Sequence, residues 1–185
     1  LRQQLEINVV GQVAVTQAVL PRLRKSHGRV VFVSSVSGRI TTPLTGAYSA
    51  SKFALEALAD AARMELHPWG IRVSVVEPAQ TDTDMWRTAD ETAQAEADKL
   101  SPAQVELYRR HMDGFRAKAI PMSQKAAKPA DTVAAVIERA LTSPRPKARY
   151  IVGAAPKLQA RVVGLMPTSV RDGVLSKFSG IPRSL

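Results

Sequence analysis

Two short runs of β-branched residues, separated by a long helical pattern, constrain the fold of this chain more than any other feature. Residues 29–35 (RVVFVSS) and 71–78 (IRVSVVEP) have the valine-rich composition of strands that are buried on both faces of a sheet. Residues 47–67 lie between them and repeat apolar residues at helical spacing. A strand, a helix and a second strand in this order form a βαβ unit, which implies a parallel sheet with a right-handed crossover. The sequence therefore predicts an α/β fold.

The rest of the chain adds helices and one more strand to this unit. Apolar spacing predicts a helix at 3–25, before the first strand. The segment 79–128 is largely polar and alanine-rich, and long excursions of this kind serve as binding loops and lids. The remaining predicted elements are helices at 102–118 and 128–144, a third strand at 148–153, and an amphipathic segment at 157–178 that Pro167 interrupts.

Hydroxyl, phenol and amine groups are predicted to meet at one edge of this sheet. Ligands of open α/β sheets bind beyond the carboxyl ends of the strands, and Ser34 and Ser35 end the first predicted strand. Tyr48 and Lys52 are one helical turn apart, so they share a face of the helix at 47–67. A lysine ammonium close to a phenol favours the phenolate and lowers its pKa from about 10 toward neutrality. The pair is a candidate for general acid–base catalysis, and Ser35 is placed to hold a substrate oxygen.

Four segments resemble consecutive motifs of the short-chain dehydrogenase/reductase family, in order and at family spacing. They are INVVG (7–11), GRVVFVSSVSG (28–38), YSASK (48–52) and IRVSVVEPAQTDT (71–83). The resemblance implies a Rossmann-like, doubly wound parallel sheet. It also implies two regions, a partial catalytic domain at 1–155 with a substrate loop at about 79–128, and an amphipathic tail at 156–185.

By this resemblance, the chain is the catalytic part of an oxidoreductase that uses NAD or NADP to interconvert a secondary alcohol and a ketone. Tyr48 would be the general acid or base, Lys52 would lower its pKa and hold the nicotinamide ribose, and Ser35 would position the substrate carbonyl. Asn8 falls on the family's active-site asparagine, which orders a water of the proton relay. The cofactor-binding residues that the resemblance implies are Asn8, Tyr48, Lys52, Pro78, Ala79, Thr81 and Thr83, the last of which contacts the nicotinamide amide.

Two departures from the family pattern concern the cofactor. Pro78 is followed by Ala79, where the family usually has glycine, so this turn must accommodate a Cβ atom. The Gly-rich TGxxxGxG loop, the residue that selects NAD or NADP, and the NNAG segment do not occur in the sequence. We therefore expect this sequence to be a piece of a longer chain, without the N-terminal strands of the sheet.

The sequence also allows two other functions, serine acyl transfer and a non-enzymatic role. Ser49 to Lys52 also spell S-x-x-K, the acylating motif of penicillin-binding proteins, but its S-D-N and K-T-G partners do not occur. A non-enzymatic alternative is a truncated, inactive family member or an oligomerisation module, because family helices equivalent to 3–25 and 47–67 pack against a partner subunit. An in-frame Gly-rich motif upstream of Leu1 would favour the enzyme.

The amino-acid composition indicates a cellular compartment and limits the classes of binding partner. The chain has no cysteine, which fits a reducing cytoplasm, and its three histidines have no metal-ligand spacing. Its net charge of +10 comes from residues 101–185, but the basic residues are scattered and aromatics are 5%, so we expect no nucleic-acid partner. Basic and apolar residues alternate at 157–178, which leaves membrane-surface attachment as a weaker alternative. The segment RALTSPRPKARYIVG resembles family members that act on lipophilic alcohols, so we expect a small lipophilic substrate.

Overall fold

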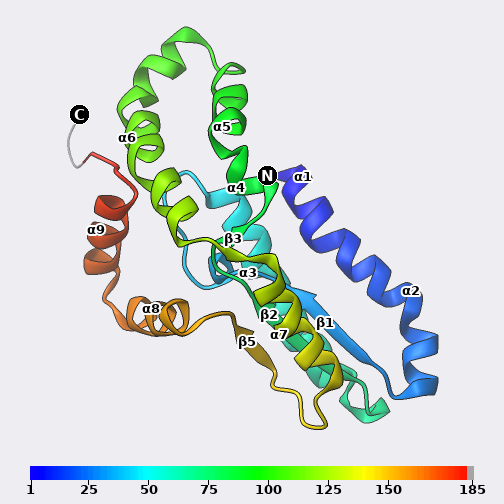
Figure 1. Cartoon of the computed structure of the whole chain (residues 1–185). Coiled ribbons are helices and arrows are strands. Elements are labelled where there is room, and N and C mark those ends of the chain that lie inside the picture. The colour runs from blue at the N-terminus through cyan, green and yellow to red at the C-terminus, as the bar shows by residue number, and fades with distance from the viewer. Residues whose placement is uncertain (183–185) are drawn as a thin grey trace. The chain divides into compact units, whose positions relative to one another are not determined.

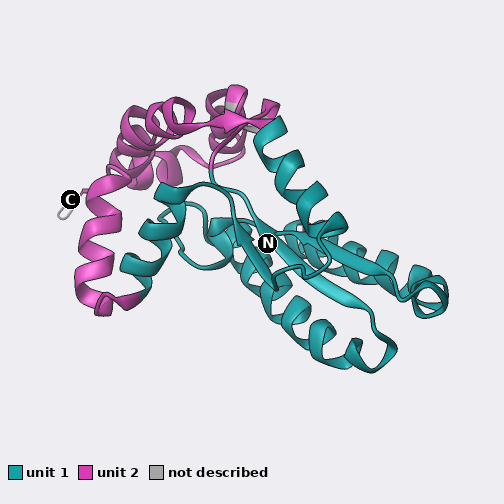
Figure 2. Cartoon of the chain, turned by 60° about the horizontal axis from the view of Figure 1, so that its bottom comes forward, with its two compact units in different colours: residues 1–79, 131–164 teal, residues 80–130, 165–185 magenta. Residues whose placement is uncertain are grey.

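The computed structural model describes residues 1–182, without the side chains of Met85 and Trp86, and divides into two compact units (Figures 1 and 2). Unit 1 comprises residues 1–79 and 131–164, and unit 2 comprises residues 80–130 and 165–185. The predicted tail at 156–185 is therefore shared between the two units.

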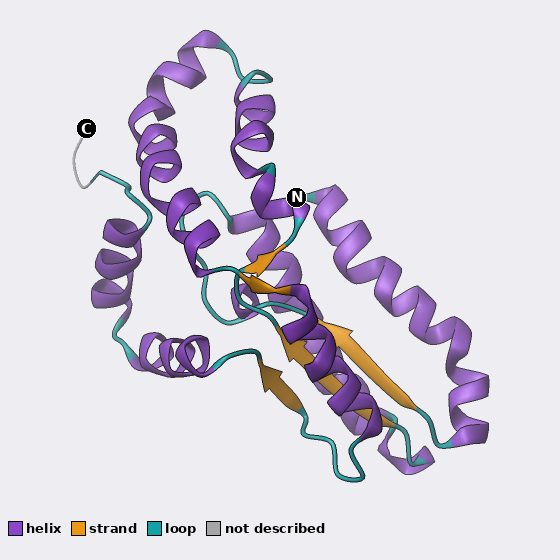
Figure 3. Ribbon diagram, in the orientation of Figure 1, coloured by secondary structure: helices purple, strands orange, loops and turns teal. Residues whose placement is uncertain are grey.

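Unit 1 contains a parallel sheet with the strand order β1-β2-β5 (Figure 3). Its strands are β1 (Arg29–Val33), β2 (Arg72–Glu77) and β5 (Arg149–Ile151). The pairing aligns Phe32 with Val75, and Val76 with Tyr150. The predicted α/β fold with a parallel sheet is confirmed, although each strand is shorter than predicted.

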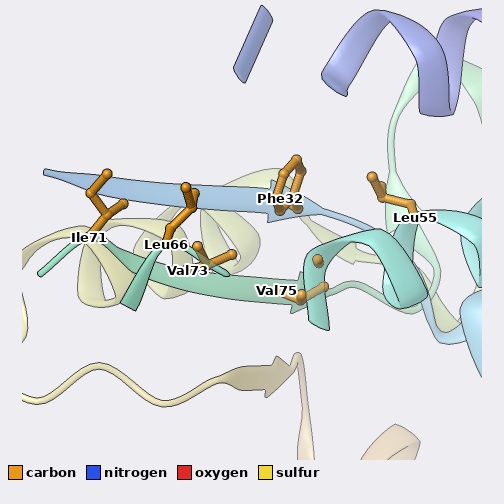
Figure 4. Close-up of a cluster of buried hydrophobic side chains, with 7 residues drawn as sticks. Phe32, Leu55, Leu66, Ile71, Val73 and Val75 are labelled. Atoms are coloured by element: carbon orange, nitrogen blue, oxygen red, sulfur yellow. The ribbon is translucent and has the colours of Figure 1, made fainter. Parts of the chain in front are cut away.

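Helices cover both faces of the central strand, β2. Successive side chains of a strand point to opposite faces of the sheet, so β2 packs against a different helix on each face. On one face, Val73 and Val75 join a cluster with Leu55 and Ala59 of α3 (Gly46–Glu65), as Figure 4 shows. On the other face, Val76 packs with Ala140 of α7 (Ala130–Thr142). The long crossover helix that the sequence predicts at 47–67 is thus α3, followed by the short 3-10 turn η3 (His67–Trp69).

The strand β1 differs from the prediction. Only Phe32 is buried along β1, and Val33 is 39% exposed, so burial on both faces is correct for β2 but wrong for β1. The reason is position, since β1 pairs only with β2 within the described residues and is therefore an edge strand. A groove of about 470 Å³ runs along β1, lined on its helical side by Ile7, Gly11, Gln12, Val15, Thr16, Val19 and Leu23.

The predicted helix at 3–25 is interrupted by one wide turn. It consists of α1 (Arg2–Leu5), a π-helical turn η1 (Glu6–Val10) and α2 (Gly11–Ser26). His27 then ends the helix in the left-handed conformation, with φ of 47°. A π turn adds one residue to a helical turn, and such turns are frequent at functional sites.

Unit 2 is mainly helical. The predicted helix at 102–118 extends to residue 126 in α6 (Pro102–Ala126), and Ser101 begins it with a capping box to Gln104. A two-residue parallel ladder joins β3 (Thr81–Asp82) to β4 (Lys128–Pro129), and strands this short leave no periodic pattern to predict. The other helices of unit 2 are α4 (Asp84–Arg87), α5 (Ala89–Ala97) and α9 (Thr168–Phe178).

Pro167 separates α9 from α8 (Ala154–Leu165), so the predicted break in the amphipathic segment is present. Over residues 1–182, no helix is both long enough and apolar enough to cross a membrane.

Candidate active site

The first turns of α3 carry Tyr48 and Lys52 on one face, next to the end of β1. Tyr48 is half-buried, and Lys52 is only 7% exposed. The Lys52 Nζ atom lies 5.7 Å from the centroid of the Tyr48 ring and donates a hydrogen bond of 3.1 Å to the Val33 carbonyl. The buried lysine is therefore fixed between the phenol and the end of the strand.

The pKa of Tyr48 is shifted in the direction opposite to the prediction. Burial raises the pKa of the phenol above its usual value near 10, and a hydrogen bond with the Ser35 side chain only partly offsets the rise. Burial sets this shift, and the lowering of the Tyr48 pKa by Lys52 stays a prediction. Burial also lowers the pKa of Lys52 itself, which weakens the cation that was expected to favour the phenolate.

The two serines after β1 lie in different surroundings. Ser35 lies next to Tyr48 and lowers the pKa of the phenol. Its Oγ atom donates to the Pro78 carbonyl at 3.4 Å and accepts the Ser37 N–H at 3.1 Å. It begins the 3-10 turn η2 (Val36–Gly38). Ser34 is also buried, but it lies beside the Glu56 carboxyl on the other side of the turn. This placement favours Ser35 over Ser34 as the group next to the phenol.

Asn8 lies in the π turn and reaches α3. Its Nδ2 atom donates to the Ser51 hydroxyl at 3.0 Å and to the Gln4 side chain at 2.9 Å. The Ser51 hydroxyl in turn donates to the Tyr48 carbonyl at 2.7 Å. The structure therefore brings Asn8, Ser35, Tyr48 and Lys52 together around the start of α3. It adds Ser51, which no motif in the sequence singled out for this site.

The remaining predicted cofactor residues follow β2. The Pro78 carbonyl accepts the Val36 N–H at 2.9 Å, so the chain after β2 is tied to the turn that carries Ser35. Ala79 ends this part of unit 1, whereas Thr81 and Thr83 belong to unit 2. There the Thr83 hydroxyl donates to the Thr81 carbonyl at 3.3 Å, next to the start of α4. The roles of these four residues stay predictions.

A buried ion-pair network beneath the site was not predicted. Glu77 is fully buried at the end of β2, and both Nε and Nη2 of Arg39 donate to its carboxylate. Arg149 of β5 donates to Glu56 at 3.1 Å and to Asp60 at 2.6 Å, and its Nε lies 3.4 Å from Glu77. Charged residues on the inward face of α3 and inside an apolar strand were the available signal, since such groups are buried only when paired.

Gly38, at the end of η2, lies where this turn packs closely against α3. A Cβ atom there would lie 2.9 Å from Glu56 Cγ, 3.0 Å from Ser34 Oγ and 3.1 Å from the Lys52 carbonyl oxygen. These contacts are too short for an alanine side chain, and one of them is to backbone.

We therefore expect Gly38→Ala to lower the free energy of unfolding by about 1–3 kcal/mol, the usual cost of overpacking a core. Urea unfolding measures this loss. Gly164→Ala is the matched control, because that glycine lies in α8 with no atom within 4 Å of its added Cβ. The control should be neutral or stabilising by about 0.5–1 kcal/mol. If both substitutions changed the free energy of unfolding equally, the close packing around Gly38 would not be the cause of the loss.

The chain matches known proteins over most of its length but only part of theirs. A family model described as short chain dehydrogenase matches residues 1–94. Retinol dehydrogenase 16 of Homo sapiens is 33% identical over 183 residues, which are 96% of this chain and 57% of that protein. An NADPH-dependent 3-dehydrocapnine reductase of Ornithobacterium rhinotracheale is 33% identical over 182 residues, or 96% of this chain and 62% of that protein.

A solved structure shares the fold. It is a short chain dehydrogenase from Burkholderia cenocepacia in complex with NADP, with a TM-score of 0.63 and 22% identity. The match covers 94% of this chain and 58% of the Burkholderia chain. This chain thus spans less than two thirds of the length of each of these proteins.

Proposed function

Because this chain belongs to the short-chain dehydrogenase/reductase family, we propose that it is the catalytic part of an NAD(P)-dependent oxidoreductase. The reaction is the interconversion of a secondary alcohol and a ketone. We propose it for the full-length protein, since this chain spans about 57–62% of the relatives described above. The observation that supports it best is Tyr48 with Ser35 on its phenol and the buried Lys52 one turn away.

The residues present fit one end of a nicotinamide cofactor. The Lys52 ammonium has three donors, and the described residues take one of them, through the Val33 carbonyl. Its other donors and the Tyr48 hydroxyl suit the hydroxyls of a ribose. Nothing in the sequence supplies the Gly-rich turn that holds a pyrophosphate. In this proposal Tyr48 and Lys52 would hold the nicotinamide ribose, and a bound NAD(P) would supply or take up the hydride.

The side chains of this chain then handle the proton. Ser35 donates a hydrogen bond to the substrate oxygen and orients it toward the phenol. In the direction of reduction, Tyr48 donates its proton to that oxygen, and the raised pKa keeps the phenol in the protonated form that this step needs. In the direction of oxidation, the phenolate accepts the proton, and the Lys52 cation stabilises the phenolate. Asn8 steadies this part of α3 through Ser51.

The substrate class is proposed from the relatives. Retinol dehydrogenase 16 is named for a lipophilic primary alcohol, so at 33% identity it supports an apolar substrate, whereas the secondary alcohol is implied by the family resemblance. We propose a small lipophilic alcohol or ketone. The test is to follow NAD(P)H absorbance while the full-length protein is presented with secondary alcohols and ketones of increasing apolar size. Turnover that rises with apolar size supports the proposal, and no turnover with any of them contradicts it.

A second candidate is an oligomerisation module. It is favoured by exposed apolar side chains on the two helices that the sequence predicts at subunit contacts. On α2 these are Val15 and Val19, and on α3 they are Phe53 and Leu58. The two candidates are compatible, and only catalysis requires Tyr48.

Lys52→Met should weaken cofactor binding and change the pH dependence of alcohol oxidation. Loss of a charged hydrogen-bond donor is expected to raise the cofactor Kd about 10–100-fold. Without the cation the phenol ionises less readily, so the pH at which oxidation reaches half its maximum should move upward. Calorimetry and pH–rate profiles measure the two effects. Lys147→Met, at an exposed lysine, is the control. A slower variant with an unchanged profile would show that Lys52 does not tune the phenol.

A further inference from the structure

The proposed mechanism needs Lys52 to be positively charged but does not explain what keeps this buried side chain protonated. The ammonium is buried, and among the described residues its hydrogen bond goes to the neutral Val33 carbonyl. Burial lowers the pKa of Lys52, and the negative charge of Glu56 opposes that effect. Glu56 follows Lys52 by one helical turn, so the two side chains share a face of α3.

We propose that Glu56 is a positioning residue of this site, whose carboxylate keeps Lys52 charged and is itself held by Arg149. This inference rests on the proposed function, in which Lys52 must be a cation to hold the ribose and to stabilise the phenolate of Tyr48.

The surroundings hold Glu56 in one place. It is 7% exposed, and its Oε2 atom accepts the Arg149 Nε–H at 3.1 Å. Gly38 lies beside its Cγ atom. Burial raises the pKa of Glu56 and so does the nearby Glu77, whereas Ser34 and Arg149 lower it. The hydrogen bond from Arg149 thus favours the charged carboxylate against the cost of burial.

The other carboxylates around the site are engaged by arginines. From β2, Glu77 binds Arg39 of the loop after η2 and lies 3.4 Å from Arg149. From α3, Asp60 accepts a hydrogen bond from Arg149 at 2.6 Å and also pairs with Arg63. The neutral groups beside the Lys52 ammonium are the Val33 carbonyl and the Tyr48 ring, while Ser35 lies next to Tyr48 and Asn8 reaches this part of α3 through Ser51. Glu56 is therefore the carboxylate whose charge acts on Lys52.

A chain of alternating charges runs from Glu56 through Arg149 to Glu77 and Arg39. It joins α3 to β5, β2 and the loop after η2. Arg149 is 93 positions from Glu56, so the C-terminal strand of the sheet contributes to the charge state of the active site.

The test is Glu56→Gln in the full-length protein, which removes the charge and keeps the shape. The pKa of Lys52 is read directly from its Cε signal in protein with 13C-labelled lysine, assigned by its loss in Lys52→Met. We expect the Lys52 titration to move to lower pH in Glu56→Gln. The fall in turnover at high pH, where Lys52 loses its proton, should move to lower pH by the same amount.

Two variants separate charge from packing. Asp60→Asn removes a hydrogen bond to the same arginine but should leave the Lys52 titration unchanged. Glu56→Asp keeps the charge and should titrate close to wild type. A purely structural role for Glu56 would change stability in all three variants without moving either pH profile.

A measurement on the unmodified protein covers the case in which Glu56→Gln does not fold. If the two groups interact, the Lys52 signal must show a second, smaller inflection at the pH where the 13C-labelled carboxyl of Glu56 titrates. An unmoved Lys52 titration in Glu56→Gln, or no such inflection in wild type, overturns the proposal. These signals do not depend on turnover, so an inactive protein with a shifted Lys52 titration would contradict the oxidoreductase and leave the Glu56–Lys52 interaction standing.

Discussion

Tyr48→Phe in the full-length protein is expected to lower kcat by at least about a hundredfold, the usual contribution of a general acid–base. The substitution removes the phenol oxygen that forms the hydrogen bond with Ser35 and leaves the ring beside Lys52. The cofactor Kd should change little, because the proton is transferred only in the transition state. Steady-state kinetics and a cofactor titration measure the two quantities.

Tyr150→Phe is the matched control for this experiment. The Tyr150 hydroxyl accepts a hydrogen bond from the Lys147 backbone N–H at 2.8 Å, so this variant also loses a phenol oxygen with a partner. Its turnover should stay near that of wild type. If Tyr48→Phe kept more than about a tenth of wild-type turnover, the assignment of Tyr48 as acid–base would be wrong.

Residues 1–185 expressed alone should bind NAD(H) and NADP(H) too weakly to turn over, and should be oligomeric or poorly soluble. The exposed side of β1 carries unpaired backbone groups and borders the groove of about 470 Å³, and an open strand edge of this kind promotes association. The sequence also lacks the Gly-rich turn whose backbone N–H groups would hold the cofactor pyrophosphate.

Calorimetric titration with each cofactor, together with light scattering, tests both halves of this prediction. The full-length protein is the control and should bind one of the two cofactors. A monodisperse, soluble monomer of residues 1–185 with micromolar affinity for either cofactor would contradict it, and would mean that this chain completes the cofactor site by itself.

The parts of the fold that were predicted correctly are those that depend on local composition. The valine run of β2 and the apolar stripe of α3 form the buried centre of unit 1. Both are visible in the sequence because the spacing within one element decides which of its residues face the core. The composition of β1 predicted burial on both faces, because an edge strand and a central strand have the same composition and differ only in their neighbours. The uncovered valine-rich edge was predictable only from the family resemblance, which implies that the neighbouring strands are absent. The π turn at Asn8 was missed because the residues of η1 fit an α-helix equally well.

Electrostatics was the least predictable part of the site. The spacing of Tyr48 and Lys52 correctly placed them together on α3, but the direction of the Tyr48 pKa shift depends on burial, which the spacing does not reveal. Charged residues inside apolar elements indicated buried ion pairs, but Glu56, Glu77 and Arg149 are far apart in the chain, so no local pattern shows which of them pair. Ser34 and Ser35 are adjacent, and only the path of η2 shows which one faces the phenol.

Crystal structures of the full-length protein with NAD⁺ and with NADP⁺ test the central claim most directly. The proposal predicts that, in at least one complex, the nicotinamide ribose lies within hydrogen-bond distance of Tyr48 Oη and Lys52 Nζ, with Ser35 facing the nicotinamide. A cofactor bound with its nicotinamide away from Tyr48 and Lys52 in both complexes would contradict the assignment of this site.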